Sequence, residues 1–340
     1  MTASDSVPER IPDVPPISVD LSAELDVLSF ELADRIATGA SGEVYRQSLS
    51  DGTTVAVKVP DTSRTITDGR IDRILDEAED WAEFEANEYV VSLVDYGIDD
   101  GQPWIAMEYM DRGHLGDFLD RGGVQSLCHG LWIARCIASG IEEAHYRGTA
   151  HRDIKPQNVL FRTVEDGWNV PKLGDWGTAS TLRSSSETIG EYTPRYAAPE
   201  QHARQVETRN QKMVDVFQFG IVLFLLFTGK HPYGRTTKRA GDAEPPHPSE
   251  VRPGIPRALE EVIRRCLNPE PEDRYEDIRP SCTVSTSSGT RCVARHACVQ
   301  FYGRRRASLA RLWVIESRRS TASGARPGGT SLRISFDPAN

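Results

Sequence analysis

The stretch AHRDIKPQNVL, residues 150–160, constrains the chain more than any other feature. It concentrates polar side chains within eight residues, although apolar residues flank it on both sides. Among them are His151, Arg152, Asp153, Lys155 and Asn158. A merely solvated loop has no need of such flanks, because water satisfies its charged groups. We therefore expect a polar loop that a hydrophobic core holds in place.

The periodicity of the sequence predicts two parts of different character. Residues 28–110 mostly alternate in the manner of strands and are rich in β-branched residues, apart from helical spacing over residues 70–86. Most of the chain that follows has the pattern of helices. The sequence thus predicts an α+β chain in which a small strand-rich lobe with one helix precedes a larger helical lobe. The hinge between them is expected near residues 108–113.

The two ends differ from this body in composition. Residues 1–20 are rich in proline and acidic side chains, and we expect a flexible segment over residues 1–27. Beyond residue 280 the chain contains ten arginines, two acidic residues and no lysine, with much serine and glycine. We expect residues 281–340 to be a disordered tail.

The charge balance limits the classes of partner. The net charge is −10, and lysine occurs only six times, always before residue 280. Such a body resembles proteins of salt-loving organisms, although an ordinary acidic cytoplasmic protein has the same balance. An acidic body argues against binding to nucleic acid.

Neither the apolar runs nor the cysteines point to a membrane or an oxidising compartment. The longest apolar run, residues 216–227, is shorter than the roughly 20 residues that a bilayer requires and contains Gln218, so we expect a buried helix. The six cysteines form no CxxC pair, and no secretory signal precedes them. We therefore expect reduced thiols, no membrane span and a cytoplasmic location.

A second polar motif, KLGDWG, supplies what the first one lacks for phosphoryl transfer. Asp153 can accept or orient the proton of an attacking hydroxyl, and Lys155 can neutralise charge on the transferred group. Asn158 and Asp175 offer hard oxygen ligands for Mg²⁺ or Mn²⁺. The spacing H-R-D-x-K-P-x-N, followed by D-W-G, is not expected of a solvated loop.

The strands before these motifs can hold the phosphates of a nucleotide. Gly39 and Gly42 lie in the sequence IATGASGEVYRQ, although an ordinary β-turn would give the same pattern. Lys58 ends an apolar strand, where an unpaired buried charge is costly, so it needs an anion unless it extends to solvent at a strand edge. On the following helix, Glu77 is the preferred partner because the bulky Trp81 lies one turn on, and Glu79 remains the alternative.

With these motifs, the chain resembles the eukaryotic-type (Hanks-type) Ser/Thr protein kinases over residues 28–280. The glycines, Lys58, HRDIKPQN, DWG and TPRYAAPEQ occur in the order and spacing of that family. The resemblance implies the bilobal protein-kinase fold. It has a small antiparallel sheet and one helix in an N-lobe over about residues 28–108, and a larger helical C-lobe over about residues 112–280.

The resemblance also implies a role for each matching residue. Lys58, Glu77, Asp153 and Lys155 would be the catalytic set, with Asn158 and Asp175 as metal ligands. ATP would bind against the glycine hairpin and the linker that follows the gatekeeper Met107. The residues expected to contact ATP are Gly39, Gly42, Val44, Ala56, Lys58, Glu108, Met110, Asn158, Leu160 and Asp175. Two departures are Ala37 in place of the first glycine and Trp176 in place of the usual phenylalanine, and neither removes a reacting group.

Further ion pairs and regulatory groups are implied by the same family. Glu200 should pair with Arg274, and Asp215 should reach the backbone of the catalytic loop. Arg152 beside the catalytic aspartate suggests control by phosphorylation, because such an arginine needs an anion to settle it. The candidate regulatory residues are Ser184, Ser185, Ser186, Thr188 and Thr193, although a flexible polar loop would contain the same residue types.

The expected activity is transfer of the γ-phosphate of ATP to Ser or Thr hydroxyls of protein substrates, including the chain itself. Lys155 with Thr193 is the Ser/Thr arrangement, and a full activation segment offers a platform for a polypeptide. Two alternatives stay open, a catalytically weak nucleotide-binding scaffold and a small-molecule kinase. Oligomeric state is also open, with a homodimer as one alternative.

Overall fold

The structure is a computed structural model and places most of the chain in two compact units. It describes residues 7–8, 10–25, 34–39, 42–60, 68–84, 87–124, 126–165, 167–177, 180–181, 192–202, 210–234, 244–281, 294–302 and 310–317. The first unit comprises residues 1–114 and 160–179, and the second comprises residues 115–159 and 180–340.

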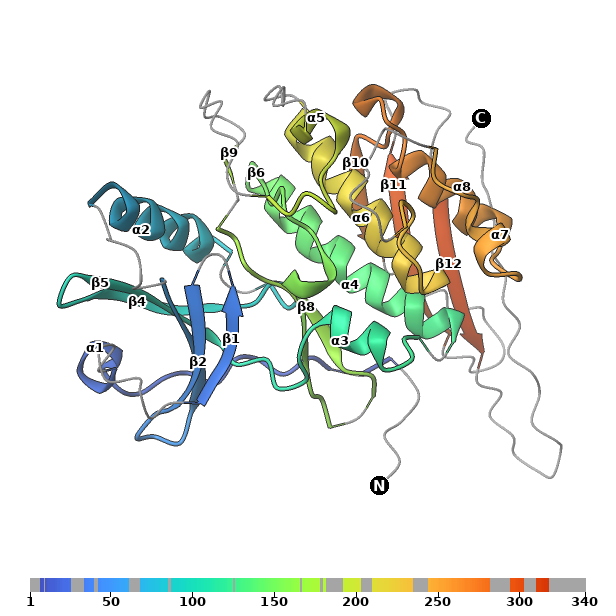
Figure 1. Ribbon diagram of the computed structural model, residues 1–340. Coiled ribbons are helices and arrows are strands. Elements are labelled where there is room, and N and C mark those ends of the chain that lie inside the picture. The colour runs from blue at the N-terminus through green and yellow to red at the C-terminus, as the bar shows by residue number, and fades with distance from the viewer. Residues whose placement is uncertain are drawn as a thin grey trace, which may run out of the picture. The chain divides into compact units, whose positions relative to one another are not determined.

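The first unit contains a five-stranded sheet in the order β1-β2-β3-β5-β4, in which all neighbouring pairs are antiparallel. Figure 1 shows these strands in blue to teal, with the helix α2 beside them. Their bounds are β1 (Asp34–Gly39), β2 (Gly42–Ser48), β3 (Thr54–Val59), α2 (Asp68–Ala82), β4 (Leu93–Asp99) and β5 (Gln102–Glu108). The predicted antiparallel sheet is confirmed.

Alternation along β3 explains how one sheet serves two purposes. Val55, Val57 and Val59 belong to one buried cluster, so Ala56 and Lys58 point to the opposite face of the sheet. That second face carries α2, whose Glu77 is in contact with Lys58. The sheet thus presents Lys58 on one side while β-branched residues pack on the other.

A hairpin from the middle of the sequence belongs to the first unit. Strands β7 (Val159–Arg162) and β8 (Val170–Leu173) pair with each other. The hairpin bonds to the chain before β4, where Leu173 donates its N–H to Tyr89 O at 2.8 Å and Val91 donates to Leu173 O at 2.9 Å. Assigning all of residues 112–280 to the larger lobe is therefore corrected for residues 160–179, because these backbone bonds hold the hairpin on the first unit.

The second unit is mainly helical. Its elements are α3 (Leu115–Asp120), α4 (Leu127–Tyr146), β6 (Thr149–Ala150), the 3₁₀ turn η2 (Pro156–Asn158), β9 (Ser180–Thr181), α5 (Pro199–His202), α6 (Gln211–Thr228), α7 (Pro248–Val251), α8 (Arg257–Cys266) and the 3₁₀ turn η4 (Pro271–Asp273). The predicted helical lobe is confirmed.

Helix α6 is the core of the second unit. It packs on α4 and α8, and at Gly220 an added Cβ would lie only 2.7 Å from Cys266 Cβ. Within the described residues, α6 is the helix long and apolar enough to cross a bilayer, and most of it is buried inside the protein. Its apolar character therefore matches the predicted buried helix.

The N-terminal segment departs from the prediction of a flexible lead-in. Residues 21–24 form α1 (Leu21–Glu24), and the side chains of Leu21 and Leu25 are buried against the sheet of the first unit. These two leucines are four positions apart, so a single helical turn places both on one face. The prediction of a flexible segment over residues 1–27 did not include this packing of Leu21 and Leu25.

The tail also contains regular structure that the sequence reading did not predict. Strands β10 (Asp277–Ser281), β11 (Ala294–Tyr302) and β12 (Ala310–Ser317) form an antiparallel sheet, which contacts α4 and α8 (Figure 1). Both β11 and β12 are rich in β-branched and aromatic residues, which favour strands. The expectation of disorder over residues 281–340 is therefore corrected for these two strands.

Candidate active site

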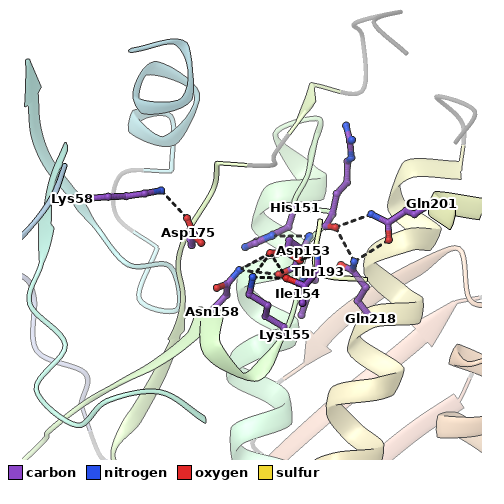
Figure 2. Close-up of polar contacts among 11 residues, drawn as sticks. Lys58, His151, Asp153, Ile154, Lys155, Asn158, Asp175, Thr193, Gln201 and Gln218 are labelled. Carbon is purple, nitrogen blue, oxygen red and sulfur yellow. Dashed lines mark hydrogen bonds and ion pairs between the residues drawn. The ribbon is translucent and has the colours of Figure 1, made fainter. Parts of the chain in front are cut away.

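Two carboxylates of the first unit lie next to the ammonium group of Lys58. The Nζ atom of Lys58 lies 2.9 Å from Asp175 Oδ1 and 3.3 Å from Glu77 Oε1 (Figure 2 draws the bond to Asp175). Lys58 is the residue before the last of β3, Glu77 comes from α2, and Asp175 follows β8. Of the two glutamates considered from the sequence, the one within reach of Lys58 is Glu77.

The electrostatics of this group keep Lys58 charged. Burial lowers the pKa of Lys58, but the carboxylates of Asp175 and Glu77 outweigh it and raise the pKa above its ordinary value. Asp175 has a positive φ of 62°, and its side chain is 40% exposed. Gly177 lies so close to Glu77 that an added Cβ would be 2.9 Å from Oε1. The glycine of the DWG motif therefore leaves room for the carboxylate that pairs with Lys58.

The hairpin of β1 and β2 carries the predicted glycines. Gly39 is paired with Gly42 at the end of the hairpin, and Val44 is paired with Lys58 on β3. Gly42 has a φ of 143°, and an added Cβ there would lie 2.2 Å from Val59 O. Only glycine allows this conformation and this approach.

The predicted nucleotide linker follows β5. Ala56 is paired with Met107, and Met110 is buried. Leu160 forms an isolated bridge with His114 on the chain that follows the linker. These contacts bring the linker and the start of the β7–β8 hairpin together within the first unit.

The side chain of Glu108 has a role that the sequence reading missed. Its carboxylate accepts hydrogen bonds from Arg162 Nη1 at 2.6 Å and from Lys172 Nζ at 2.7 Å, and it is almost completely buried. Burial lowers the pKa of Lys172, and the charge of Glu108 opposes this effect. The signal in the sequence was Lys172, a lysine between the apolar residues of VPKLG.

In the second unit, a compact polar cluster surrounds Asp153 (Figure 2). Lys155 Nζ lies 2.5 Å from Asp153 Oδ2 and donates to Thr193 Oγ1 at 2.7 Å. Thr193 N donates to Asp153 Oδ1 at 3.0 Å. The structure therefore places Thr193 beside the carboxylate.

Asn158 completes this cluster. Its Nδ2 donates to Asp153 O at 2.9 Å, so its amide oxygen is the atom available for a cation. Amide and carboxylate oxygens are the donors that Mg²⁺ prefers, so the chemistry of Asn158 and Asp175 fits the predicted metal. They lie in different units, and their joint role as ligands stays a prediction.

Three side chains form hydrogen bonds with the backbone of the loop that carries Asp153. Asp215 accepts from the N–H groups of His151 at 2.9 Å and Arg152 at 2.7 Å, so its predicted reach to the loop is confirmed. Gln218 and Gln201 both donate to Arg152 O, at 2.8 and 2.9 Å. The same Gln218 accepts from Ile154 N at 2.7 Å.

This clamp explains the backbone of Arg152 and shows what the sequence reading missed. Arg152 has a positive φ of 66°, which costs energy in a residue that is not glycine. Hydrogen bonds from both sides hold it there. Gln218 stands out in the sequence as a polar residue in an apolar run, but this pattern alone does not show which loop its amide reaches.

Comparison with known proteins decides the family. The protein kinase domain family matches residues 30–282. The chain belongs to the protein kinase family. It is 32% identical over 287 residues to the serine/threonine-protein kinase Pkn1 of Myxococcus xanthus, which covers 78% of this chain and 40% of the relative. It is 30% identical over 274 residues to the serine/threonine-protein kinase A of Synechocystis sp., covering 73% of this chain and 51% of the relative.

A third relative gives the same result. The serine/threonine-protein kinase PknH of Mycobacterium tuberculosis is 31% identical over 257 residues, covering 72% of this chain and 40% of the relative. The kinase chain thus spans about half or less of the length of these relatives.

The chain contains the predicted ion pair between Glu200 and Arg274, near the end of the region that matches the family. Arg274 Nη1 and Nη2 donate to the two carboxylate oxygens of Glu200 at 2.6 and 2.9 Å, which confirms the predicted pair. Such a bidentate pair fixes orientation as well as distance.

Arg152 of the HRDIKPQN loop is a buried cation. Burial lowers the pKa of Arg152, and the negative charge of Asp215 acts in the opposite direction. Its Nε atom is buried and makes no hydrogen bond within the described part of the chain. The candidate phosphorylation sites Ser184, Ser185, Ser186 and Thr188 lie outside the described residues.

Proposed function

We propose that this chain is an ATP-dependent protein kinase that phosphorylates Ser and Thr hydroxyls of proteins, including its own. The observation that carries the proposal is the cluster of Asp153, Lys155, Asn158 and Thr193, in which a carboxylate is held by a lysine, a hydroxyl and a backbone N–H. The family and its relatives support this activity.

The residues of the cluster divide the work of phosphoryl transfer. The carboxylate of Asp153 orients the acceptor hydroxyl and takes its proton as the phosphoryl group leaves ATP. Lys155, already bonded to Asp153 and Thr193, supplies positive charge next to the acceptor. The hydroxyl of Thr193 holds Lys155 and Asp153 in fixed positions, so the hydroxyl group of the substrate meets a fixed set of partners.

In the first unit, Lys58 supplies a cation for the phosphates of ATP. Glu77 and Asp175 hold its ammonium group between them, so it is oriented before ATP arrives. Asn158 and Asp175 would hold Mg²⁺, which when bound neutralises charge on the phosphates. Gly39, Gly42, Val44, Ala56, Leu160 and the linker residues Glu108 and Met110 would line the nucleotide site.

Phosphorylation of the activation segment is the proposed regulation. The buried guanidinium of Arg152, whose Nε makes no hydrogen bond within the described residues, would be satisfied by a phosphate on a neighbouring segment. The candidates are Ser184, Ser185, Ser186 and Thr188. Treatment with a phosphatase should lower the activity, and unchanged turnover would contradict this regulation.

The remaining parts of the proposal concern location and partners. We place the activity in the cytoplasm, with protein substrates and no nucleic-acid partner, on the basis of the acidic composition and the buried character of α6. A homodimer is one oligomeric state that the proposal allows.

The deciding experiment is Mg²⁺-dependent transfer of labelled phosphate from ATP to the chain or to a generic basic protein. Asp153→Asn should reduce transfer on the order of 10²–10⁴-fold, because it removes the proton acceptor. Asp117→Asn, on the exposed surface of α3, is the matched control and should retain activity. Equal labelling by Asp153→Asn and the unaltered protein would reject catalysis and leave a nucleotide-binding scaffold. Turnover of ATP with a metabolite but without protein labelling would indicate a small-molecule kinase.

A further inference from the structure

The N-terminal segment, residues 10–25, lies along the first unit as a strap. Its polar anchors are at the turn between β2 and β3. There Ser18 donates through its N–H and Oγ to Asp51 Oδ2, at 3.2 and 3.0 Å. Close by, Glu24 accepts from Ser50 N at 2.9 Å and from the Ser50 hydroxyl. Two side chains of the strap are therefore fastened to two neighbouring residues of one turn.

The strap is also held by a shared hydrophobic cluster. Leu21 and Leu25 are 4% exposed and pack with Val55, Val57 and Val59 of β3, on the sheet face opposite Lys58. Figure 1 shows α1 and α2 on opposite sides of this sheet. The strap therefore covers the rear of the strand that carries the phosphate-binding lysine.

The other end of the strap reaches Arg162 on β7. Arg162 Nη1 lies 3.5 Å from Pro12 O, and Nη2 lies 3.4 Å from Asp13 O. The same guanidinium donates to the Glu108 carboxylate at 2.6 Å. The strap residues Val14 and Pro15 line one groove together with Glu108, Tyr109 and Arg162. The strap thus runs along the linker itself.

The charges at this point explain why the strap matters there. Glu108 is a single buried carboxylate facing two cations, Arg162 and Lys172. The carbonyl oxygens of Pro12 and Asp13 are two further acceptors for the surplus positive charge. Without them, Arg162 would have fewer partners at a site where its side chain is only 17% exposed, and a partly buried cation is costly unless it is hydrogen-bonded.

Glu108 connects this network to the linker. It is the last residue of β5, its N–H donates to Ser92 O at 2.9 Å, and its carboxylate accepts from Ser92 N at 3.4 Å. Its position therefore depends on both its backbone bond and the cations that hold its side chain.

We propose that the strap positions the linker for ATP through Arg162, which acts as a positioning residue. Docking of residues 10–25 holds Arg162, Arg162 holds Glu108, and Glu108 fixes the backbone against which the adenine binds. The inference rests on the proposed function in one respect, namely that ATP binds at this linker.

The link between strap and linker can be measured without ATP by amide hydrogen exchange with mass spectrometry. The double variant Ser18→Ala/Glu24→Ala removes both polar anchors from the strap side. Peptides covering the strap and residues 104–110 should then exchange about five-fold faster or more. The matched control is Asp20→Ala/Ser22→Ala, which removes one carboxylate and one hydroxyl from exposed positions of the same segment and should change neither peptide.

Arg162→Ala tests the link from the other end. It should speed amide exchange in residues 104–110 and in the first part of the strap. Arg162→Lys keeps the positive charge but lacks the forked guanidinium group, so it should restore only part of the protection from exchange. Unchanged exchange of residues 104–110 in both Arg162→Ala and the strap variant would overturn the proposal.

A double-mutant cycle, with the KM for ATP as the measured quantity, tests whether the strap acts on the linker through Arg162. Each of the two variants should raise KM about five-fold or more while kcat changes less, as expected for a coupling between distinct sites. The KM for ATP of the combined variant should be no higher than that of Arg162→Ala alone, because both changes act through the same contact between the strap and Arg162. If the two changes raise the KM independently, so that their fold-increases multiply in the combined variant, the strap does not act through Arg162.

The two proposals fail in distinguishable ways. If the unaltered protein transfers no phosphate, but the strap variant raises amide exchange in both the strap and the linker, the proposed activity is wrong. The inference about the strap then still stands. If phosphate transfer is normal but the strap variant leaves amide exchange of the linker unchanged, the further inference is wrong and the proposed activity stands.

Discussion

At the scale of single residues, the buried guanidinium of Arg274 shows how one side chain fastens several segments. All five of its N–H groups are used. Two bond to Glu200, and the others bond to the carbonyl oxygens of Asn268, Met213 and Pro269 at 2.7 to 2.9 Å. Its side chain is fully buried and lies over the ring of Phe217, 4.7 Å from the centroid. The pair therefore joins the activation segment to α6 and to the chain after α8.

Loss of Arg274 should destabilise the second unit strongly. Arg274→Leu leaves the carboxylate of Glu200, with a side chain 9% exposed, without its cation, and it removes the donor to the carbonyl oxygens of Asn268, Met213 and Pro269. Breaking a buried pair from one side costs about 3–5 kcal/mol of unfolding free energy, measured here by urea denaturation. Arg257→Ala, which removes an exposed arginine paired with Glu261, is the control and should leave the midpoint unchanged. A similar small effect for both variants would show that the buried pair is dispensable.

Also at this scale, sequence reasoning succeeded where a motif constrains chemistry. Asp153, Lys155 and Asn158 lie in one cluster because a short loop brings them together whatever surrounds it. It failed for Gln201 and Gln218, since which buried amide reaches a loop carbonyl depends on three-dimensional packing. Glu108 was predicted as a linker residue that contacts ATP, but its side chain acts with partners more than 50 positions away in the sequence.

At the scale of elements, close contact between α6 and α8 rests on Gly220. An added Cβ would lie 2.7 Å from Cys266 Cβ and 3.3 Å from the backbone carbon of Cys266. Neither atom belongs to the far end of a flexible side chain, so the helices would have to separate.

Gly220→Ala should therefore destabilise the protein although alanine favours helices. Overpacking a tight core costs about 1–3 kcal/mol, against a gain of up to about 1 kcal/mol from helix propensity. The control is Gly69→Ala in α2, where the added Cβ meets nothing within 4 Å, so the propensity gain should appear alone. Thermal unfolding of both variants measures the difference. Stabilisation by Gly220→Ala would show that α6 and α8 can move apart freely.

The elements themselves were mostly predictable, and their exceptions have physical causes. Periodicity indicated β3, α2 and α6 because each buries one face or all of its residues. The strap was missed because one turn of helix gives too little periodicity to recognise, and its burial depends on a sheet that follows it in sequence. The β7–β8 hairpin was assigned to the larger lobe because sequence order does not reveal which body its backbone bonds to.

At the scale of the whole molecule, acid should destabilise the fold partly through His231. Burial, followed by the charge of Arg195, lowers the pKa of His231 from 6.5 to about 4, while a backbone hydrogen bond at Arg195 opposes them. The ring lies against Tyr196 and Tyr233, at centroid distances of 5.4 and 6.0 Å. His231 is therefore held neutral in the folded protein at pH values where the unfolded chain would protonate it.

The sign of the effect follows from proton binding. Between pH 6.5 and about 4 the unfolded chain binds a proton at this histidine and the folded protein does not, so stability is lost as the pH falls through that window. The unfolding free energy of the unaltered protein should fall by about 2–3 kcal/mol more between pH 7 and pH 4 than that of His231→Gln. Urea denaturation at several pH values gives both curves, and subtracting them removes the common contribution of the carboxylates. Parallel curves would mean that His231 titrates alike in the folded and unfolded chains, and that its burial among the tyrosines does not keep it neutral.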